Sequence, residues 1–439
     1  MNEFLLRMQS LLGDEFQNYL TCYQAPRFRG LRVNTRKCTA EQLQKALGFP
    51  LQPTPFCPDG YYIPPEIEGL GNHPLHHCGA FYMQEPSASS AVEMLGVKPG
   101  DMVLDLCAAP GGKSTQIGVK LRGEGLLWSN EIVKSRANIL LSNIERMGIA
   151  NAVVSNAHPD VLCQALSGQF DRVLVDAPCS GEGMFRKSDE AQTDWSVEHV
   201  KSCAERQLHI LRSADKALKP GGVLVYSTCT FSKEENEDVI ARFLSEHPEY
   251  SPEDAGVSFG RDAMNGARRI FPMDGGEGHF AARLRKNGEV AQISFIENKP
   301  AADSRVLDFY DSLFADRPFG ENIEVIHSKI MILPKNYNAA WKGMNILRAG
   351  VILGEIVKNR IEPHHSAFMA ALPSQCVNVL SLSSDSAEIR RYLHGEEIAA
   401  PPSLKGYAAV CVDGMTTGFG KASNGRLKNK YPKGLRTLK

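Results

Sequence analysis

Residues 105–114 decide the fold of this 439-residue chain, and they read Asp105-Leu-Cys-Ala-Ala-Pro-Gly-Gly-Lys-Ser114. They follow the apolar run Met102-Val-Leu104, so an expected strand ends in a glycine-rich turn and opens a helix. Glycine has no side chain to obstruct a ligand, and the first turn of a helix presents unpaired N–H groups. The segment predicts a turn that holds a nucleotide-like ligand, although a glycine pair by itself is common in structural turns.

Helices and strands alternate around this unit, from about residue 84 to residue 285. Strands are expected at 101–106, 125–130, 153–155, 170–175 and 222–227, and helices at 87–95, 114–121, 134–147, 197–219 and 234–247. This alternation is typical of a mainly parallel sheet with both faces covered by helices. Such sheets bind ligands at the carboxyl ends of their strands, near the point where the strand order reverses.

Further strands of this predicted sheet end in residues that can do chemistry. Glu131 follows the strand at 125–130, where nucleotide-binding folds use an acid to bind ribose hydroxyls. Asp176 and Cys179 follow the strand at 170–175, and Cys229 follows the strand at 222–227. A single buried cysteine is usually structural, but two thiols at one sheet edge favour a chemical role.

The two ends of the chain carry basic segments. The amino-terminal segment between residues 21 and 40 has no acid, and a solvated loop and a phosphate-binding loop explain it equally well. No acid occurs from residue 414 to the end, where glycines and Tyr431 separate the charges, so this segment favours a folded nucleic-acid surface. The candidate RNA-binding residues are Arg27, Arg29, Arg32, Arg36, Lys421, Arg426, Lys428, Lys430, Lys433 and Arg436.

Composition restricts the class of protein. The formal charge is -1 with 49 basic and 50 acidic residues, so a polyanion would be bound by local patches rather than by a global field. The longest apolar runs fall short of a bilayer span and the start lacks the pattern of a secretory signal, so we expect no membrane contact and a cytoplasmic location. The 11 cysteines include no Cys-x-x-Cys pair, and His76, His77 and Cys78 are adjacent without ligand spacing, so no metal is expected.

The organisation along the chain suggests four regions. Residues 1–80 form an amino-terminal region that opens with one amphipathic helix over 5–20 and has a second helix at 40–47. Residues 81–297 form the alternating core, and a linker is expected at 298–303. Residues 298–382 form an intermediate α+β region with a helix at 304–314, and residues 383–439 contain the basic end.

These motifs together carry a family resemblance. The runs Asp-Leu-Cys-Ala-Ala-Pro-Gly-Gly-Lys, Asp-Ala-Pro-Cys-Ser-Gly-Glu-Gly and Ser-Thr-Cys-Thr occur here in the order and spacing that resemble RNA 5-methylcytosine methyltransferases of the NOL1/NOP2/Sun family. The end of the chain, with Gly418-Phe-Gly-Lys and residues 427–436, is similar to the RsmF-like branch, which acts on bacterial 16S ribosomal RNA. The resemblance implies a Rossmann-like S-adenosylmethionine-dependent methyltransferase core between an amino-terminal RNA-binding extension and a carboxyl-terminal PUA-like RNA-binding domain.

The resemblance also implies residue roles. Cys229 would be the nucleophile that adds to carbon 6 of cytosine, and Cys179 would assist release of the product. Asp176 would hold the cytosine ring, and Lys113 would lower the pKa of the nucleophile or hold Asp176. The cofactor S-adenosylmethionine would be bound by Cys107, Ala108, Ala109, Pro110, Gly111, Gly112, Lys113, Glu131, Arg136, Asn156 and Asp176. Asn156 stands where many relatives have an acid.

The expected function is methylation of carbon 5 of a cytidine in small-subunit ribosomal RNA, by a monomer. Transfer RNA as the substrate is the first alternative, and the RsmF-like end of the chain argues against it. A non-catalytic RNA-binding assembly factor is a second alternative. The presence of both thiols, Lys113 and Asp176 argues against a non-catalytic role.

Overall fold

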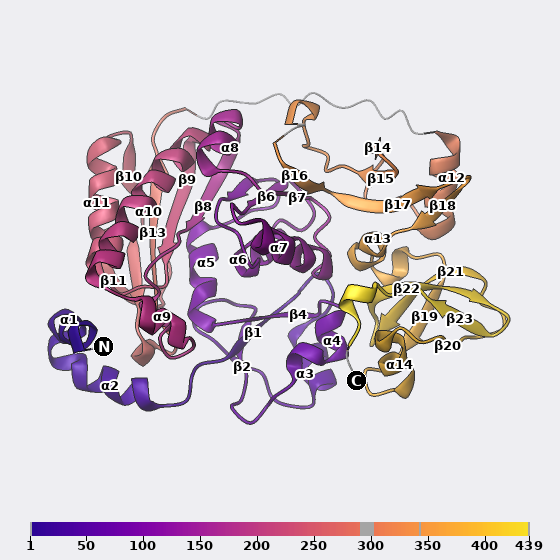
Figure 1. The fold of residues 1–439 in the computed structure, drawn as a ribbon, viewed down its shortest axis with the longest axis horizontal. Coiled ribbons are helices and arrows are strands. Elements are labelled where there is room, and N and C mark those ends of the chain that lie inside the picture. The colour runs from indigo at the N-terminus through magenta and orange to yellow at the C-terminus, as the bar shows by residue number, and fades with distance from the viewer. Residues whose placement is uncertain (1, 290–302, 342–343, 438–439) are drawn as a thin grey trace.

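A mixed sheet of ten strands forms the centre of the molecule (Figure 1). The computed structural model describes residues 2–289, 303–341 and 344–437. Five strands of the central sheet run parallel in the order β9-β8-β5-β6-β7. They are β5 (Met102–Asp105), β6 (Leu126–Asn130), β7 (Ala152–Ser155), β8 (Phe170–Asp176) and β9 (Leu218–Thr228). The strand order reverses between β5 and β8, so the carboxyl ends of these two strands lie side by side.

Antiparallel strands extend this sheet on both sides. Beyond β9 lie β13 (His279–Lys286), β12 (Ala267–Ile270) and β11 (Arg261–Met264), with β10 (Tyr250–Pro252) also pairing with β13. Beyond β7 lies β16 (Ile346–Ala349), which comes from the predicted intermediate region. The central sheet is therefore completed by a strand far along the chain.

Helices cover both faces of the sheet, as the alternation predicts. One face is covered by α5 (Ser90–Leu95), α6 (Gly112–Lys120) and α7 (Lys134–Arg146), and the other by α8 (Pro159–Ala165), α10 (Val197–Ala217) and α11 (Glu237–Glu246). Successive side chains of a strand point to opposite faces. Leu104 and Trp128 accordingly pack in the α8–α10–α11 layer, whereas Val103 and Leu127 pack in the other. The predicted doubly covered core is confirmed.

The amino-terminal region differs from the prediction in one helix. The single helix expected over 5–20 is wrong, because the chain forms α1 (Asn2–Leu12) and α2 (Phe16–Gln24) with a break at Gly13. Gly13 has a φ of +54°, which a continuous right-handed helix does not allow. The helix expected at 40–47 is present as α3 (Ala40–Leu47).

A small sheet follows these helices, in the order β2-β3-β1-β4. Its strands are β1 (Gly30–Val33), β2 (Gln52–Pro53), β3 (Gly60–Tyr62) and β4 (Phe81–Gln84), and the short helix α4 (Pro74–His77) precedes β4. Because β4 pairs with β1, the amino-terminal unit extends past the predicted boundary at residue 80.

Two further sheets form the carboxyl-terminal part, on the right of Figure 1. The first contains β14 (Ile323–Ile326), β15 (Lys329–Ile332), β17 (Val351–Val357) and β18 (Arg360–Pro363). The second contains β19 (Val379–Leu382), β20 (Ile398–Ala399), β21 (Gly406–Val412), β22 (Met415–Ser423) and β23 (Arg426–Asn429). Helices α12 (Ser304–Leu313), α13 (His365–Ala370) and α14 (Ala387–His394) accompany them. Residues 298–302 of the predicted linker lie outside the described residues. In the part of the chain described, no helix has the length and apolar character to cross a bilayer.

Gly79 connects α4 to β4 at a point where the backbone approaches α7. Its φ is +70°, and a Cβ there would lie 2.0 Å from the carbonyl oxygen of Arg146. We expect Gly79→Ala to lower the free energy of unfolding by about 2 kcal/mol or more, because backbone strain and overpacking add. Gly48→Ala is the matched control, since Gly48 has a φ of +75° but open space around its Cβ. Equal losses in chemical unfolding of the two variants would contradict the steric explanation.

Candidate active site

The glycine-rich turn lies at the carboxyl end of β5, as predicted. Gly111 has a φ of +113°, a value that favours glycine, and α6 begins at Gly112. A Cβ on Gly112 would lie 3.1 Å from the side-chain nitrogen of Gln84. The turn is thus tightly packed against the amino-terminal sheet, and Cys107 and Ala109 face the adjoining cavity.

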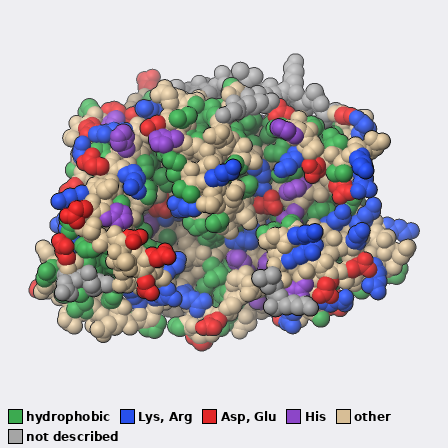
Figure 2. Space-filling view, viewed as in Figure 1, with side chains coloured by type: hydrophobic (Ala, Val, Ile, Leu, Met, Phe, Trp, Pro, Cys, Tyr) green, Lys and Arg blue, Asp and Glu red, His purple; other side chains and the backbone are tan. Residues whose placement is uncertain are grey.

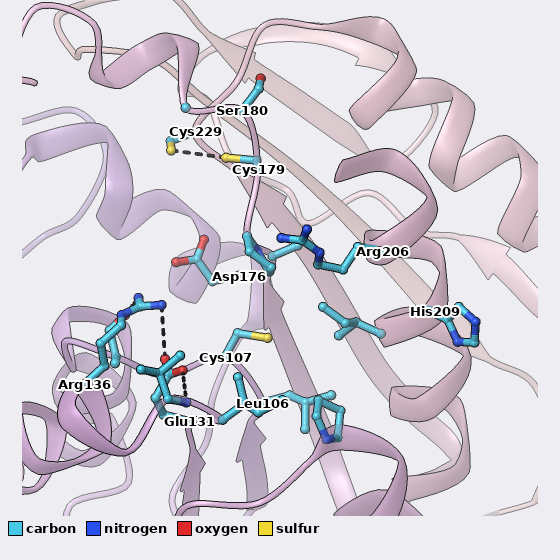
Figure 3. Close-up of a pocket in the computed structure, with 18 of the residues that line it drawn as sticks. Leu106, Cys107, Glu131, Arg136, Asp176, Cys179, Ser180, Arg206, His209 and Cys229 are labelled. Carbon is cyan, nitrogen blue, oxygen red and sulfur yellow. Dashed lines mark hydrogen bonds and ion pairs between the residues drawn. The ribbon is translucent and has the colours of Figure 1, made fainter. Parts of the chain in front are cut away.

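A cavity of about 1060 Å³ opens at this edge of the sheet. Figure 3 shows Glu131 and Arg136 at one end of it, Cys179 and Cys229 at the other, and Asp176 between them. The volume is just above the usual range for ligand pockets, which is about 300–1,000 Å³. The cavity therefore has room for a nucleoside-sized ligand beside a second ring.

Glu131 forms the polar wall at the first end of the cavity. The residue is 3% exposed, and one carboxylate oxygen accepts a hydrogen bond of 2.9 Å from the backbone N–H of Val133. Arg136 lies 3.5 Å from the other oxygen and also donates to the carbonyl of Ala109 at 2.9 Å. Arg136 therefore links the carboxylate to the glycine-rich turn.

Asn156 plays a different part from Glu131. Its side-chain amide donates to the backbone carbonyls of Glu131 and Ile132, at 2.7 and 2.8 Å. The amide thereby holds the loop after β6, while His158 and Asp160, at the start of α8, line the cavity. Direct contact of Asn156 with a cofactor stays a prediction.

The two predicted thiols meet at the far end of the cavity. The sulfur atoms of Cys179 and Cys229 are 3.3 Å apart, although 50 residues separate them in the chain. The strands that deliver them, β8 and β9, are parallel neighbours with Asp176 opposite Ser227. The hydrogen bond with Cys229, together with burial, raises the pKa of the Cys179 thiol well above its ordinary value. Cys179 therefore stays protonated beside Cys229 at neutral pH.

Asp176 and Lys113 form an ion pair beside the thiols. Lys113 Nζ lies 2.8 Å from one oxygen of Asp176, and Ser227 donates to the other at 2.8 Å. Burial raises the pKa of Asp176, but the Lys113 ammonium and these hydrogen bonds outweigh it and hold the pKa below its ordinary value. The neighbouring His279 is uncharged, because burial lowers its pKa to about 3. Asp176 is thus an ionised carboxylate whose side chain is still 30% exposed.

Two buried carboxylates that the sequence analysis did not select hold the thiol-bearing loops. Glu235 accepts from the backbone N–H of Ser180 at 2.9 Å and from Gln207 at 2.8 Å. Glu182 accepts from the backbone N–H of Phe231 at 2.8 Å and from Trp195 at 2.9 Å. The signal was the position of both acids, since Glu182 lies within the motif of Cys179 and Glu235 lies six residues after Cys229. Each carboxylate joins the loop of one thiol to other parts of the site.

Helix α10 also contributes residues that the sequence analysis missed. Arg206 and His209 line the cavity, and Figure 3 shows both beside it. They are exposed, and among the described residues Arg206 has no hydrogen bond or ion pair to its side chain. The 3.6-residue period of α10 indicates one buried stripe but does not show which polar positions face a ligand.

The amino-terminal basic residues are not equivalent. Arg32 is wrong as an RNA contact, because it is 3% exposed and its guanidinium donates to Gln84 and, at 2.7 Å, to Thr115. Arg36 is only partly exposed, and one of its guanidinium nitrogens is fully buried. Arg29 donates to the carbonyl of Ile67 at 2.7 Å. Arg27 alone of the four is exposed and has no hydrogen bond or ion pair within the described residues.

The carboxyl-terminal basic residues lie on and just after a folded sheet. Lys421 is on β22, Arg426 and Lys428 are on β23, and Lys430, Lys433 and Arg436 follow that strand. Figure 2 shows Lys and Arg side chains on the right-hand part of the molecule, where this sheet lies in Figure 1. Lys430 pairs with Glu362 and Arg426 with Glu397, both at 3.2 Å, and Arg436 donates to a backbone carbonyl. Lys421 and Lys428 are exposed and stand directly opposite each other on β22 and β23. Lys433 is exposed as well.

Comparison with protein families accounts for most of the chain. The family described as 16S rRNA methyltransferase RsmB/F matches residues 92–285, and the N-terminal domain of 16S rRNA methyltransferase RsmF matches residues 1–86. The RsmF first C-terminal domain matches residues 308–372, and the RsmF PUA domain matches residues 379–437.

Whole-chain relatives agree with these matches. The ribosomal RNA small subunit methyltransferase F of Vibrio vulnificus strain YJ016 is 32% identical over 98% of this chain and 96% of its own length. The chain belongs to the ribosomal RNA small subunit methyltransferase F family. The member from Shewanella amazonensis is 33% identical over 96% of this chain and 94% of its own length. The predicted family resemblance is confirmed.

Solved structures resemble about two thirds of this chain. A methyltransferase homolog from Pyrococcus horikoshii is 28% identical, with a TM-score of 0.58 over 65% of this chain and 95% of its own. NSun6 from Pyrococcus horikoshii, solved with SFG, has a TM-score of 0.60 over 66% of this chain and 99% of its own, and at 22% identity it shows the fold alone.

Lys113 controls the ionisation of Asp176, which leads to a prediction about pH. Replacing Lys113 by Met removes the ammonium, so we expect the pKa of Asp176 to rise and the carboxylate to take up its proton at a higher pH. Carboxyl-carbon NMR of labelled aspartate would measure this shift. Lys120→Met is the matched control, because Lys120 lies on the same helix and pairs at 2.9 Å with Glu93 instead. An unchanged Asp176 titration in Lys113→Met would contradict the assignment.

Proposed function

We propose that this chain methylates carbon 5 of a cytidine in 16S ribosomal RNA through a covalent cysteine adduct, with S-adenosylmethionine as the methyl donor. The observation that carries the proposal is the 3.3 Å approach of Cys179 to Cys229 at the cavity that also holds Glu131. The relatives' names support ribosomal RNA of the small subunit as the substrate. The proposal includes a monomeric, cytoplasmic enzyme.

The Glu131 end of the cavity fits the cofactor. A buried carboxylate at the end of the second strand is the group that binds a ribose diol in such folds, and Glu131 has this position. Ile132 and Val133 add apolar wall beside it, and Cys107 and Ala109 bring the glycine-rich turn to the cavity. When bound there, S-adenosylmethionine supplies an electrophilic methyl group. Arg136 holds the Glu131 carboxylate in place.

Cys229 acts as the nucleophile. Carbon 5 of cytosine is a poor nucleophile in the aromatic ring, but addition of a thiolate to carbon 6 makes carbon 5 electron-rich. Asp176 accepts a hydrogen bond from the amino group of the base. As the sulfur–carbon 6 bond forms, the proton that the Cys229 thiol loses moves through water to ring nitrogen 3, and the new N–H also donates to Asp176. Lys113 keeps Asp176 ionised for this role.

Cys179 acts after methyl transfer. Carbon 5 then carries both a proton and the new methyl group. Because the Cys229 sulfur is now bonded to carbon 6, the hydrogen bond that most strongly raises the pKa of Cys179 is lost, and Cys179 gives up its proton to water. The Cys179 thiolate then takes the proton from carbon 5, the electrons of that C–H bond form the carbon 5–carbon 6 double bond, and Cys229 leaves as a thiolate. Cys179 touches Cys229 and therefore lies beside the adduct. The two thiols have separate tasks, and loss of one is not equivalent to loss of the other.

Two alternatives use the same surfaces. Transfer RNA as the substrate shares the chemistry, and the similarity of the whole chain to small-subunit enzymes argues against it. A non-catalytic RNA-binding factor would not need the paired thiols or the Lys113–Asp176 ion pair. Bisulfite mapping of ribosomal RNA from a deletion strain would identify the modified cytidine, and an unchanged 16S pattern would contradict the proposed substrate.

We expect Cys229→Ala to abolish methyl transfer, because no other thiolate adds to carbon 6, while S-adenosylmethionine binding stays at the wild-type level. Transfer of a labelled methyl group to 16S RNA and calorimetric binding of the cofactor would measure the two effects. Cys203→Ala is the control, since Cys203 is a buried structural cysteine on α10. Residual turnover in Cys229→Ala would contradict the nucleophile assignment.

The Cys179→Ser variant is expected to trap RNA on the protein, because Cys229 still adds to carbon 6 and carbon 5 still takes the methyl group from the donor, but Cys229 is not expelled. A denaturing gel with end-labelled RNA would show the trapped complex as a retarded band. If the retarded band accumulated with the Cys229 variant instead, the two roles would be reversed.

The opposed lysines of β22 and β23 predict a phosphate site. Like charges directly opposite each other are unfavourable, and an RNA phosphate between Lys421 and Lys428 removes that cost. We expect the double variant Lys421→Ala/Lys428→Ala to bind RNA more weakly, with the slope of log K against log salt reduced by about 2. Arg426→Ala is the control, because Arg426 is already paired with Glu397. Removing residues 414–439 would be less informative, since this deletes β22 and β23.

A further inference from the structure

A second, smaller hollow adjoins the catalytic cavity. Its volume is about 290 Å³, and Met184 lines both spaces. Met184 belongs to the loop that follows Cys179, so the same loop forms part of the wall of both. We call the smaller space the side hollow, and its lining includes Arg27, Phe28, Met83, Met184, Lys187 and Glu277.

Part of the lining of the side hollow is apolar. Phe28 is half-buried and its ring packs on Tyr62 with a centroid distance of 6.0 Å. Met83 is 36% exposed, which is unusual for a large apolar side chain in the amino-terminal sheet, and Met184 is partly exposed beside it. An aromatic ring and two thioethers offer the kind of surface on which a nucleobase stacks.

Two cations at the side hollow form no hydrogen bond or ion pair within the described residues. Burial raises the pKa of the nearby Glu277, and the charge of one of these cations, Arg27, acts against that rise. Arg27 and Lys187 are exposed, and neither has a hydrogen bond or an ion pair to its side chain among the described residues. The neighbouring Arg29 and Arg186 are different, since both donate to backbone carbonyls. Arg27 and Lys187 are therefore available to bind a phosphate, whereas Arg29 and Arg186 maintain the structure.

Glu277 fixes the geometry of the side hollow. It is 5% exposed, and one carboxylate oxygen accepts 2.6 Å from the backbone N–H of Phe28 and 3.3 Å from Arg186. The backbone N–H of Glu277 in turn donates to Glu85 at 2.8 Å. The Phe28 loop is thereby tied to the loop after Cys179, so the position of the ring is set relative to the thiols.

We propose that the side hollow binds the nucleotide next to the target cytidine, with its base on Phe28 and its phosphate near Arg27 and Lys187. This inference rests on the proposed function. A cytidine that leaves its stack to enter the catalytic cavity deprives its neighbour of a stacking partner. The side hollow supplies a replacement stacking surface, separated from the catalytic cavity by Met184. The protein thereby lowers the free energy needed to open the RNA at this position.

The test uses a short 16S RNA fragment that contains the mapped cytidine, with the full-length protein and S-adenosylmethionine. Fragments with an abasic site at the 5′ or the 3′ neighbour are compared with the intact fragment. We expect the abasic site on one side to raise the KM of the wild-type protein about tenfold, as one lost stack does, with kcat changed less than twofold. We expect Phe28→Ala to raise the KM for intact RNA by a similar factor. The KM of this variant should rise little further when the RNA carries the abasic site.

Matched variants isolate the ring and the charges. Phe28→Tyr keeps an aromatic face and is expected to retain the wild-type KM. Arg27→Ala and Lys187→Ala are each expected to lower the salt slope by about 1, whereas Lys201→Ala, an exposed cation of α10 away from both cavities, is not. The abasic comparison in wild-type protein does not depend on any variant folding.

The outcomes separate the two proposals. Two results would overturn the side-hollow proposal if the intact RNA is methylated. In the first, neither abasic fragment raises the KM of the wild-type protein. In the second, an abasic site raises the KM of Phe28→Ala as much as that of the wild-type protein. Both results would leave the proposed function standing. Absence of methylation of the intact fragment by wild-type protein would overturn the proposed function, and the side-hollow proposal with it.

Discussion

The meeting of two sulfurs depends on the parallel pairing of β8 with β9, with Asp176 opposite Ser227. Cys179 and Cys229 each follow that pair within three residues, so a shift in register would separate them. Strand pairing alone leaves the loops free to move, and the buried carboxylates Glu182 and Glu235 remove that freedom. The burial of these two acids therefore has a mechanical explanation, since each joins segments that are distant in the chain.

The alternating core could be predicted from the sequence because its signals are local. Apolar runs followed by Gly, Asp or Cys predict β5, β8 and β9. Because the carboxyl ends of parallel strands lie at one edge of the sheet, the sequence also predicts that the two thiols lie close together. Other features depend on contacts that no local pattern records. Arg32 belongs to a basic segment that is typical of a phosphate contact, but its position on β1 directs its side chain inward, where it donates to Thr115. The stripe over 5–20 continues across Gly13, whose positive φ is a property of the folded chain.

The charges of this nearly neutral chain fall into two groups. Many cations already form ion pairs within the protein. Lys113 pairs with Asp176, and Arg426 and Lys430 also have acidic partners. A smaller group, including Arg27, Lys421 and Lys428, is exposed with no ion pair within the described residues. This second group offers the larger gain to a polyanion, because no existing ion pair has to be exchanged for the new contact. Counting basic residues in a sequence therefore overstates the surface that is available.

The pairing of β16 with β7 has a consequence for how the regions can be exchanged. Ile346–Ala349 covers what would otherwise be the open edge of the central sheet, and the backbone of Asn156 also bonds to that of Asn345. An uncovered edge strand is a template for self-association. Grafting the carboxyl-terminal half of another enzyme onto this catalytic core would therefore require a donor that brings its own capping strand, and a chimera without one would tend to aggregate.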